Sequence, residues 1–193
     1  MSKVTVLVEG IAKQIDGGWI ASSTATLIQT PTKKIIVDPG CDRKALLAAL
    51  KKNQISLESI DYVLLTHSHT DHALLCGIFE NAKVINPVEM YEGSTQTEYE
   101  STFLGNELEI IQTPGHCQEH CSLVVPTKEG IIVVAGDLFW WVEDEEQKVD
   151  VRKIDDAHPL ETNMAQIIES RKKVLKIADF IIPGHGKMFK VEK

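Results

Sequence analysis

Short apolar runs separated by turn residues fill the first part of the chain. They occupy residues 4–8, 21–28 and 34–37, and they are interrupted by Gly17-Gly18 and by Pro31. Short apolar runs bounded by glycine and proline are typical of β-strands. The pattern therefore predicts that the chain begins as a meander of strands.

The next segment has apolar residues at the spacing of a helix, at Leu46, Leu47 and Leu50. Asp42 can cap a helix that continues through Leu50, and residues 60–65 then return as a buried strand. A second, short helix is predicted to begin near Asp71 and to include residues 73–79. Its N-terminus would add positive electrostatic potential to this region.

The second half of the chain again alternates strands with turns. Strands are predicted at residues 84–88, 107–112, 121–125, 131–134 and 180–182. Pro159 is predicted to open a long helix with an apolar stripe, which consists of Leu160, Met164, Ile167, Ile168, Val174, Leu175 and Ala178. Two β-rich halves with helices outside them predict an α/β fold, a four-layer αββα sandwich. The length of 193 residues fits a single domain over residues 1–193.

Composition and charge narrow the class of protein. The formal net charge is −8 and the sequence has no run of lysine and arginine, which argues against a broad surface for nucleic acid. The N-terminal sequence lacks the features of a signal peptide, and no apolar run approaches the roughly 20 residues that span a bilayer. We therefore expect a cytoplasmic protein without a membrane partner, either a monomer or a homodimer.

The four cysteines are expected to stay reduced in that compartment. Two of them, Cys117 and Cys121, alternate with His116 and His120 in a pattern that could form a structural zinc site. Cys121 leads into an apolar strand, where a small buried thiol is common. Packing is therefore the favoured interpretation of both thiols.

The strongest chemical signal is the sequence His-Ser-His-Thr-Asp-His at residues 67–72. Side chains two positions apart on an extended segment point the same way, so His67 and His69 can both reach one ion. Asp71 and His72 fall on the next turn of the chain, where they can hold a second ion. Imidazole suits zinc and other late first-row metals, and a carboxylate favours a catalytic site over a structural one.

Three further segments each consist of an apolar strand that ends at a glycine-containing turn with one metal-binding side chain. These side chains are His116 after Pro114-Gly115, Asp137 after Ala135-Gly136, and His185 after Pro183-Gly184. Loops at strand ends are where a rigid scaffold holds reacting groups. We expect these three residues to converge with residues 67–72 on one edge of the fold.

Taken in order, the motifs His-Ser-His-Thr-Asp-His, Thr-Pro-Gly-His, Ala-Gly-Asp and Pro-Gly-His-Gly resemble those of the metallo-β-lactamase-fold metallohydrolases. The resemblance covers nearly the whole chain. Residues 170–186 look most similar to the branch of small hydrolases typified by metallo-β-lactamase domain-containing protein 1. The family resemblance implies the same αββα fold and a hydrolytic activity.

The resemblance also implies ligands for two Zn²⁺ ions per chain, with Mn²⁺ or Fe²⁺ as alternatives. The first ion would be held by His67, His69 and His116, the second by Asp71, His72 and His185, and Asp137 would bridge them. Asp38 matches a position that supports the site by fixing the tautomer of a ligand histidine. His69 stands where diiron members of the fold carry a carboxylate, which favours zinc.

Other side chains near these motifs have more than one interpretation. His120 and His158 are more often solvated or capping histidines, although either could transfer a proton. Phe139, Trp140 and Trp141 follow Asp137 directly and could form an apolar wall of the substrate pocket. They could equally belong to the core or to a dimer contact.

The implied chemistry is hydrolysis by a metal-bridging hydroxide, with Asp71 orienting this nucleophile and Asp137 holding the two ions at their separation. Too few residues follow His185 for the glutathione-binding domain of glyoxalase II, so a glutathione thioester is not expected. The acidic run at residues 143–146 would repel a phosphate chain. We expect a small-molecule ester, lactone or phosphoester as the substrate. Metal-dependent hydrolysis of RNA is the alternative, and a zinc-stabilised binding module without activity is an alternative of another class.

Overall fold

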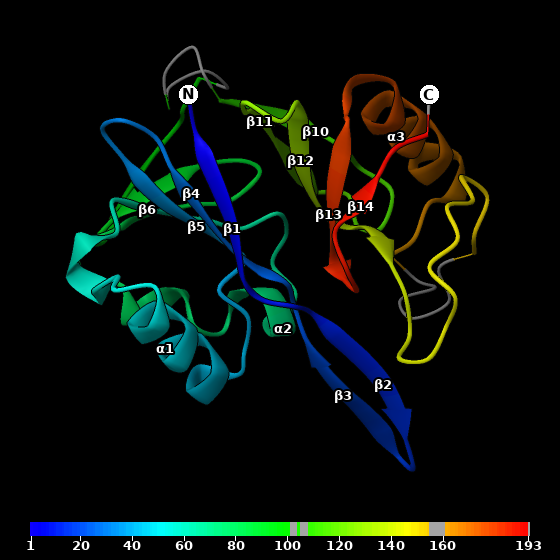
Figure 1. The fold of residues 1–193 in the computed structure, drawn as a ribbon, viewed down its shortest axis with the longest axis horizontal. Coiled ribbons are helices and arrows are strands. Elements are labelled where there is room, and N and C mark those ends of the chain that lie inside the picture. The colour runs from blue at the N-terminus through cyan, green and yellow to red at the C-terminus, as the bar shows by residue number, and fades with distance from the viewer. Residues whose placement is uncertain (101–103, 105–107, 155–160, 193) are drawn as a thin grey trace.

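The structure, a computed structural model, describes residues 1–100, 104, 108–154 and 161–192. Two β-sheets pack against each other at its centre (Figure 1). Among these residues the first sheet has the strand order β1-β4-β5-β6-β7-β8-β9. Its strands are β1 (Lys3–Val8), β4 (Ala25–Gln29), β5 (Lys34–Val37), β6 (Tyr62–Leu64), β7 (Lys83–Ile85), β8 (Met90–Glu92) and β9 (Thr95–Thr97).

The second sheet has the strand order β10-β11-β12-β13-β14 within the described ranges. Its strands are β10 (Glu109–Gln112), β11 (Cys121–Pro126), β12 (Ile131–Trp140), β13 (Phe180–His185) and β14 (Phe189–Lys190). The apolar layer between the sheets consists of Ile28, Ile35, Val37, Leu64, Ile85, Leu108, Ile110, Cys121, Leu123, Val125, Ile132, Val134 and Ile182. Both sheets therefore bury one face against the other.

Helices cover the outer faces of the two sheets. α1 (Arg43–Lys52) places Leu46 in one cluster with Ile36 of β5, whose side chain points away from the second sheet. α3 (Met164–Ile177) places Val174 against Val133 of β12 on the far side of the molecule. The structure confirms the predicted αββα sandwich. None of the described helices is both long and apolar enough to cross a membrane.

Two predicted helices have different bounds in the structure. The C-terminal helix begins at Met164, where the side chain of Asn163 caps it, and Pro159 lies outside the described residues. The helix predicted near Asp71 is shorter than expected: α2 is Thr70–Ala73, and a 3₁₀ turn at Cys76–Ile78 follows it. Glycine inside a helix costs about 1 kcal/mol relative to alanine, and Gly77 lies in that turn.

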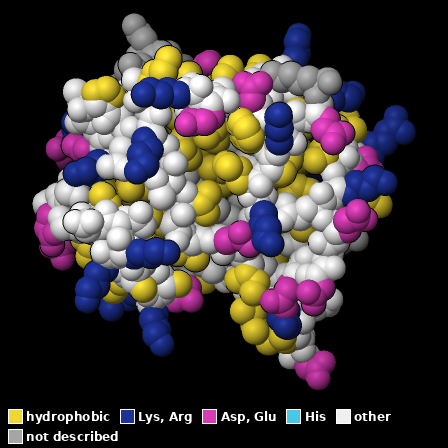
Figure 2. Space-filling model, in the orientation of Figure 1, with side chains coloured by type: hydrophobic (Ala, Val, Ile, Leu, Met, Phe, Trp, Pro, Cys, Tyr) yellow, Lys and Arg dark blue, Asp and Glu magenta, His cyan; other side chains and the backbone are white. Residues whose placement is uncertain are grey.

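A hairpin of β2 (Ile11–Ile15) and β3 (Gly18–Ser22) is a feature that the apolar pattern did not predict. It projects from the body of the sandwich (Figure 1). Ile15, Trp19 and Ile20 on this hairpin are each about half exposed. Hydrophobic side chains are visible along it in Figure 2. Its apolar residues are therefore not part of the central core.

Parallel pairing places several predicted site residues at the same edge of the sandwich. β5 pairs in parallel with β6, and β12 pairs in parallel with β13. Asp38 directly follows β5, His67 comes shortly after β6, and His185 ends β13. β12 continues past the predicted end at residue 134 and includes Asp137. The carboxyl ends of strands from both sheets thus meet, as the sequence pattern predicted.

Candidate metal centre

The side chains predicted as metal ligands lie together at this edge in two groups. Within each group the candidate ligand atoms all lie within 4.8 Å of one another. The first group consists of His67, His69, His116 and Asp137, and the second consists of Asp71, His72 and His185. The structure therefore brings together every residue of the predicted ligand set.

Asp137 lies between the two groups. Its Oδ2 is 3.4 Å from Nε2 of His116 and 3.9 Å from Nε2 of His67. Its Oδ1 is 3.1 Å from Nε2 of His72 and 3.4 Å from Nε2 of His185. One carboxylate thus presents an oxygen to each group, which is the arrangement that a bridging ligand needs.

Two glycines next to the ligands allow the strands to approach this closely. A Cβ atom at Gly184 would lie 1.8 Å from Oδ1 of Asp137, so only glycine fits beside the carboxylate. Gly136 has a φ of +51°, and a Cβ atom there would lie 2.4 Å from Oγ1 of Thr66. Glycine adopts this left-handed conformation without the steric cost of a side chain. The glycine-containing turns therefore serve close packing around the site.

Asp38 orients two of the histidines from beneath the site. The buried carboxylate accepts hydrogen bonds from the backbone nitrogen of Thr66 (2.8 Å) and from its Oγ1 (2.7 Å). Nδ1 of His72 donates to the same carboxylate at 2.9 Å. Because the Thr66 hydroxyl proton goes to Asp38, its oxygen accepts from Nδ1 of His67 at 3.0 Å. In both histidines Nε2 is left to face the metal site, as the supporting role of Asp38 requires.

Two other ligands are oriented by different means. Nδ1 of His185 lies 3.0 Å and 3.2 Å from the backbone carbonyl oxygens of Ile11 and Ser22, which can only accept a hydrogen bond. Nε2 of His69 lies 3.0 Å from a carboxylate oxygen of Glu161. The sequence patterns did not identify Glu161 as a partner of His69, because no local motif marks it. Thr66 was missed as well, although it directly precedes the histidine motif.

The first group of ligands suits a cation. Nδ1 of His67 donates to Thr66, and Nε2 of His69 donates to Glu161. The other ring nitrogens, His67 Nε2 and His69 Nδ1, therefore both carry lone pairs, although they lie only 2.9 Å apart. Nε2 of His116 lies 3.1 Å from the same Nδ1. Burial lowers the pKa of His67 well below its usual value, which keeps it in the neutral form that binds metals. Nitrogen atoms that converge in this way fit a metal ion such as zinc.

The second group also requires positive charge. His72 Nε2 and Asp137 Oδ1 are buried next to each other without a hydrogen-bond partner. Burial opposes protonation of His72, but the charges of Asp137 and Asp38 outweigh it and raise its pKa well above the usual value. Burial also opposes protonation of His185, yet the charge of Asp137 raises that pKa to about 9. Binding of a divalent ion to the neutral histidines would supply the same positive charge.

Known proteins are similar to this chain in sequence and in fold. Residues 19–100 match the family model described as Metallo-beta-lactamase superfamily. The chain is 34% identical over 200 residues to metallo-beta-lactamase domain-containing protein 1 of Xenopus laevis, covering 98% of this chain and 82% of that protein. This chain belongs to the metallo-beta-lactamase superfamily. The resemblance identified from the motifs is confirmed, and the protein is a metal-dependent hydrolase of this superfamily.

Solved structures of the superfamily show the same fold. A candidate metallo-beta-lactamase from Thermotoga maritima has a TM-score of 0.70 and 21% identity, over 98% of this chain and 99% of that chain. AidC, a dizinc quorum-quenching lactonase, has a TM-score of 0.58 and 18% identity, over 86% of this chain and 74% of that chain. These similarities establish the metallo-beta-lactamase fold for this superfamily member.

His120 is fully buried and is not a solvated or surface-capping histidine. Its Nδ1 lies 2.9 Å from Oγ1 of Thr113, which in turn lies 2.8 Å from Oγ of Ser122. Burial, together with the nearby imidazoles, lowers its pKa to about 3, so the ring is neutral. The ring centroids of His120 and His67 are 5.2 Å apart, which places His120 against a ligand. His158, the other candidate for proton transfer, lies outside the described residues.

A cavity of about 420 Å³ opens on the second group of ligands. It is lined by Ala12, Trp19, Ala21, Cys41, Thr70, Asp71, Leu74, Asp137, Trp140 and His185. Trp140 therefore occupies the predicted wall, and the ring of Trp19 meets it edge to face at 6.5 Å between centroids. Phe139 and Trp141 lie in the outer core, where both contact Phe189. Successive side chains of a strand point to opposite faces, which explains this separation.

The two neighbouring cysteines have different surroundings. Cys121 is fully buried in the layer between the sheets, and its thiol points at the carbonyl oxygen of Leu65. The thiol of Cys117 donates to the carbonyl oxygen of Glu119, and burial raises its pKa to about 12. Neither cysteine belongs to the metal-binding groups found among the described residues. For Cys121 this is the environment that the packing interpretation predicts.

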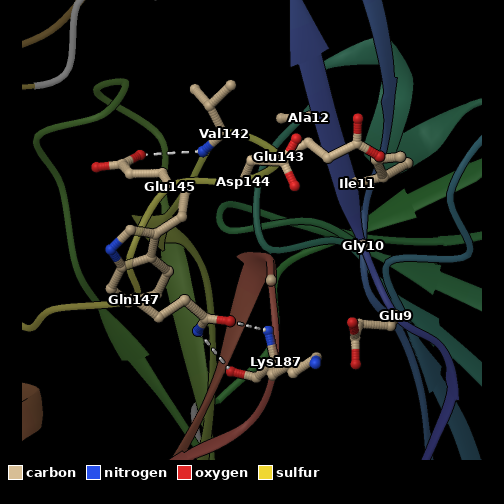
Figure 3. Close-up of a pocket in the computed structure, with 12 residues that line it drawn as sticks. Glu9, Gly10, Ile11, Ala12, Val142, Glu143, Asp144, Glu145, Gln147 and Lys187 are labelled. Carbon is tan, nitrogen blue, oxygen red and sulfur yellow. Dashed lines mark hydrogen bonds between the residues drawn. The ribbon is translucent and has the colours of Figure 1, made fainter.

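Glu143, Asp144 and Glu145 of the acidic run line a different cavity, of about 610 Å³ (Figure 3). Gly186 also lines this cavity. Its polar groups largely satisfy one another. The side chain of Gln147 accepts from the backbone nitrogen of Lys187 and donates to its carbonyl oxygen. Glu143 forms an ion pair with Lys13. The acidic run therefore does not line the cavity that opens on the metal ligands.

Proposed function

We propose that this protein is a dinuclear-zinc hydrolase that cleaves a small, largely apolar ester, lactone or phosphoester. The observation that carries the proposal is the cavity over the second group of ligands. Its wall combines the side chains of Asp71, Asp137 and His185 with the apolar side chains of Trp19 and Trp140. A substrate held there would have its reacting group at the ligands and its apolar part against the indole rings.

Zinc is supported by the donor set of five imidazoles and two carboxylates in the two groups. Two bound zinc ions supply an activated water molecule and polarise the bond under attack. Asp71 is then suited to orient the attacking water and to accept its proton. Burial would raise the pKa of Asp71, but a hydrogen bond from His185 and the charge of His72 lower it, so the carboxylate is in the ionised form that an acceptor requires.

The apolar wall argues for a substrate with a hydrocarbon portion. Trp19 and Leu74 expose 46% and 61% of their surface, which is unusual for large apolar side chains that flank charged ligands. Covering part of such a surface with a substrate is worth about 25 cal/mol per Å² of apolar area. None of the described residues that line this cavity is a lysine or an arginine. This composition favours a small ester over a polynucleotide, whose phosphates need cations.

A panel of substrates tests the proposal directly. It contains a phosphodiester chromogen, lactones with short and long acyl chains, a β-lactam, a glutathione thioester and a short single-stranded RNA, each with zinc and with manganese. We expect turnover of a lactone or phosphoester, a rate that rises with acyl length, and little activity on the thioester. RNA cleaved at physiological salt far faster than every small ester would replace the proposal with RNA hydrolysis. Metal binding without turnover of any ester would favour a binding module.

The role of the apolar wall is tested by Trp19→Ala. Loss of roughly 1 kcal/mol of apolar contact should raise KM for a long-chain lactone about fivefold and leave a short-chain lactone nearly unchanged. Ile15→Ala is the matched control, because Ile15 is similarly exposed on the same hairpin but does not line the cavity. Equal effects of both variants would mean that the hairpin acts through its stability and not through contact with the substrate.

A further inference from the structure

The ligand histidines differ in the hydrogen-bond partner of the ring nitrogen that faces away from the metal site, which we call the outer nitrogen. Those of His67 and His72 are held by Thr66 and Asp38, and that of His185 by backbone carbonyl oxygens. Thr66 and Asp38 are buried next to the ends of strands, and the two carbonyl groups belong to the backbone of β2 and β3. His69 is different, because its partner is a carboxylate from a segment 92 residues further along the chain.

His69 is also the least enclosed of the ligand histidines. Its side chain is 18% exposed, whereas those of His67, His116 and His185 are between 0% and 4% exposed. Packing therefore restricts the rotation of this imidazole less than that of the others. A hydrogen-bond partner has correspondingly more influence on the orientation of the ring and on which nitrogen carries the proton.

Glu161 lies in the segment that leads into α3. Two residues later, the backbone nitrogen of Asn163 donates to the carbonyl oxygen of Gly115 at 2.6 Å, directly before the ligand His116. Asn163 also caps α3, and Oγ of Ser170 donates to the carbonyl oxygen of Pro114 at 2.8 Å. The start of α3 is thereby attached to the loop that carries another ligand of the first group. The side chain of Glu161, which is 55% exposed, reaches His69 from the backbone of this attached segment.

We propose that Glu161 is a positioning residue of the metal centre. Its carboxylate accepts a hydrogen bond from His69 Nε2. This hydrogen bond leaves Nδ1 as the ligand atom and holds the ring so that Nδ1 faces the first group. Nδ1 already lies 2.9 Å and 3.1 Å from Nε2 of His67 and of His116. A carboxylate partner also increases the basicity of the imidazole, which strengthens its bond to a metal. The inference rests on the proposed metal centre but not on the proposed substrate.

The experiment compares Glu161→Ala and Glu161→Gln with the same two substitutions at Glu169. Glu169 is an exposed residue of α3, and its carboxylate pairs with Lys172 on the same helix. The zinc dissociation constants are measured by chelator competition, and the visible spectrum of the cobalt-loaded protein reports the coordination of the ion. The melting temperature of the metal-free protein serves as the measure of a purely structural role.

Glu161→Ala should weaken the binding of one of the two ions by 10- to 100-fold and should change the cobalt spectrum. Glu161→Gln should lose less affinity, because the amide oxygen can still accept the hydrogen bond from Nε2. Both Glu169 variants should match the unmodified protein, and all metal-free variants should melt at about the same temperature.

Unchanged zinc affinity and an unchanged cobalt spectrum in Glu161→Ala would overturn the proposal. A loss of affinity with an equal destabilisation of the metal-free protein would overturn it as well, in favour of a packing role for the segment before α3. Failure of the unmodified protein to bind zinc at all would instead count against the metal centre. The two failures are therefore distinguishable.

Discussion

Replacement of Asp38 by alanine should destabilise the protein and weaken its hold on metal at the same time. Asp38 is 1% exposed, and its carboxylate accepts from Thr66 N, Thr66 Oγ1 and His72 Nδ1. Removing it leaves the backbone N–H of Thr66 and the Nδ1–H of His72 buried without an acceptor. The hydroxyl of Thr66 can rotate toward another partner, but these two donors are fixed by the backbone and by the ring.

The structure sets the expected magnitude. Each buried donor that loses its acceptor costs about 1 to 3 kcal/mol. Asp38 also has a φ of +48°, a conformation that aspartate and asparagine tolerate better than alanine, which adds about 1 kcal/mol. We therefore expect a loss of at least about 3 kcal/mol in the free energy of unfolding, which for a chain of this size lowers the melting temperature by about 6 to 12 °C. Affinity for the ion held by His72 should fall by about 10- to 100-fold.

Differential scanning calorimetry of the metal-free protein and zinc titration measure the two effects separately. Asp61→Ala is the control, because Asp61 also accepts a backbone hydrogen bond, from Lys34, but its side chain is 35% exposed and belongs to neither ligand group. It should cost no more than about 1 kcal/mol. Asp38→Asn should recover the backbone conformation but only part of the metal affinity. If Asp38→Ala melted like the unmodified protein and bound zinc normally, the hydrogen-bond argument would be refuted.

Three further predictions concern the ligands and the thiols. The zinc-loaded protein should contain two ions per chain by elemental analysis and Asp137→Ala fewer, and a single ion with full activity would contradict the dinuclear assignment. His67→Ala and His185→Ala should each lower the hydrolytic rate on the order of a hundredfold at moderate zinc, measured by steady-state kinetics; near-normal turnover would show that the residue is not a ligand. Substitution of both Cys117 and Cys121 by serine should lower the melting temperature and leave the zinc content unchanged, so loss of an additional ion would favour the thiolate site.

The pattern of apolar runs, turns and metal-binding side chains was sufficient to predict the sandwich and most of the candidate site. Strands and turns are local patterns, and His116, Asp137 and His185 each stand next to a glycine-containing turn at the end of an apolar run. His67 and His69 are two residues apart, so their spacing alone predicts that they reach one ion. Asp137 and His185 follow apolar runs that were predicted as strands, and side chains at such strand ends were expected to converge on one edge. These predictions needed no knowledge of contacts between distant segments.

The other groups that reach the site could not be predicted, because they come from segments that are brought together only by the packing of the fold. The contact of Glu161 with His69 joins segments 92 residues apart, and it depends on how the start of α3 attaches to the loop before His116. The choice of Trp140 over Phe139 for the cavity wall depends on the direction in which β12 alternates. Trp19 belongs to a hairpin whose position relative to β12 has no local signal. Such contacts arise from the packing of elements, whose relative placement is a property of the whole fold and not of any single stretch of residues.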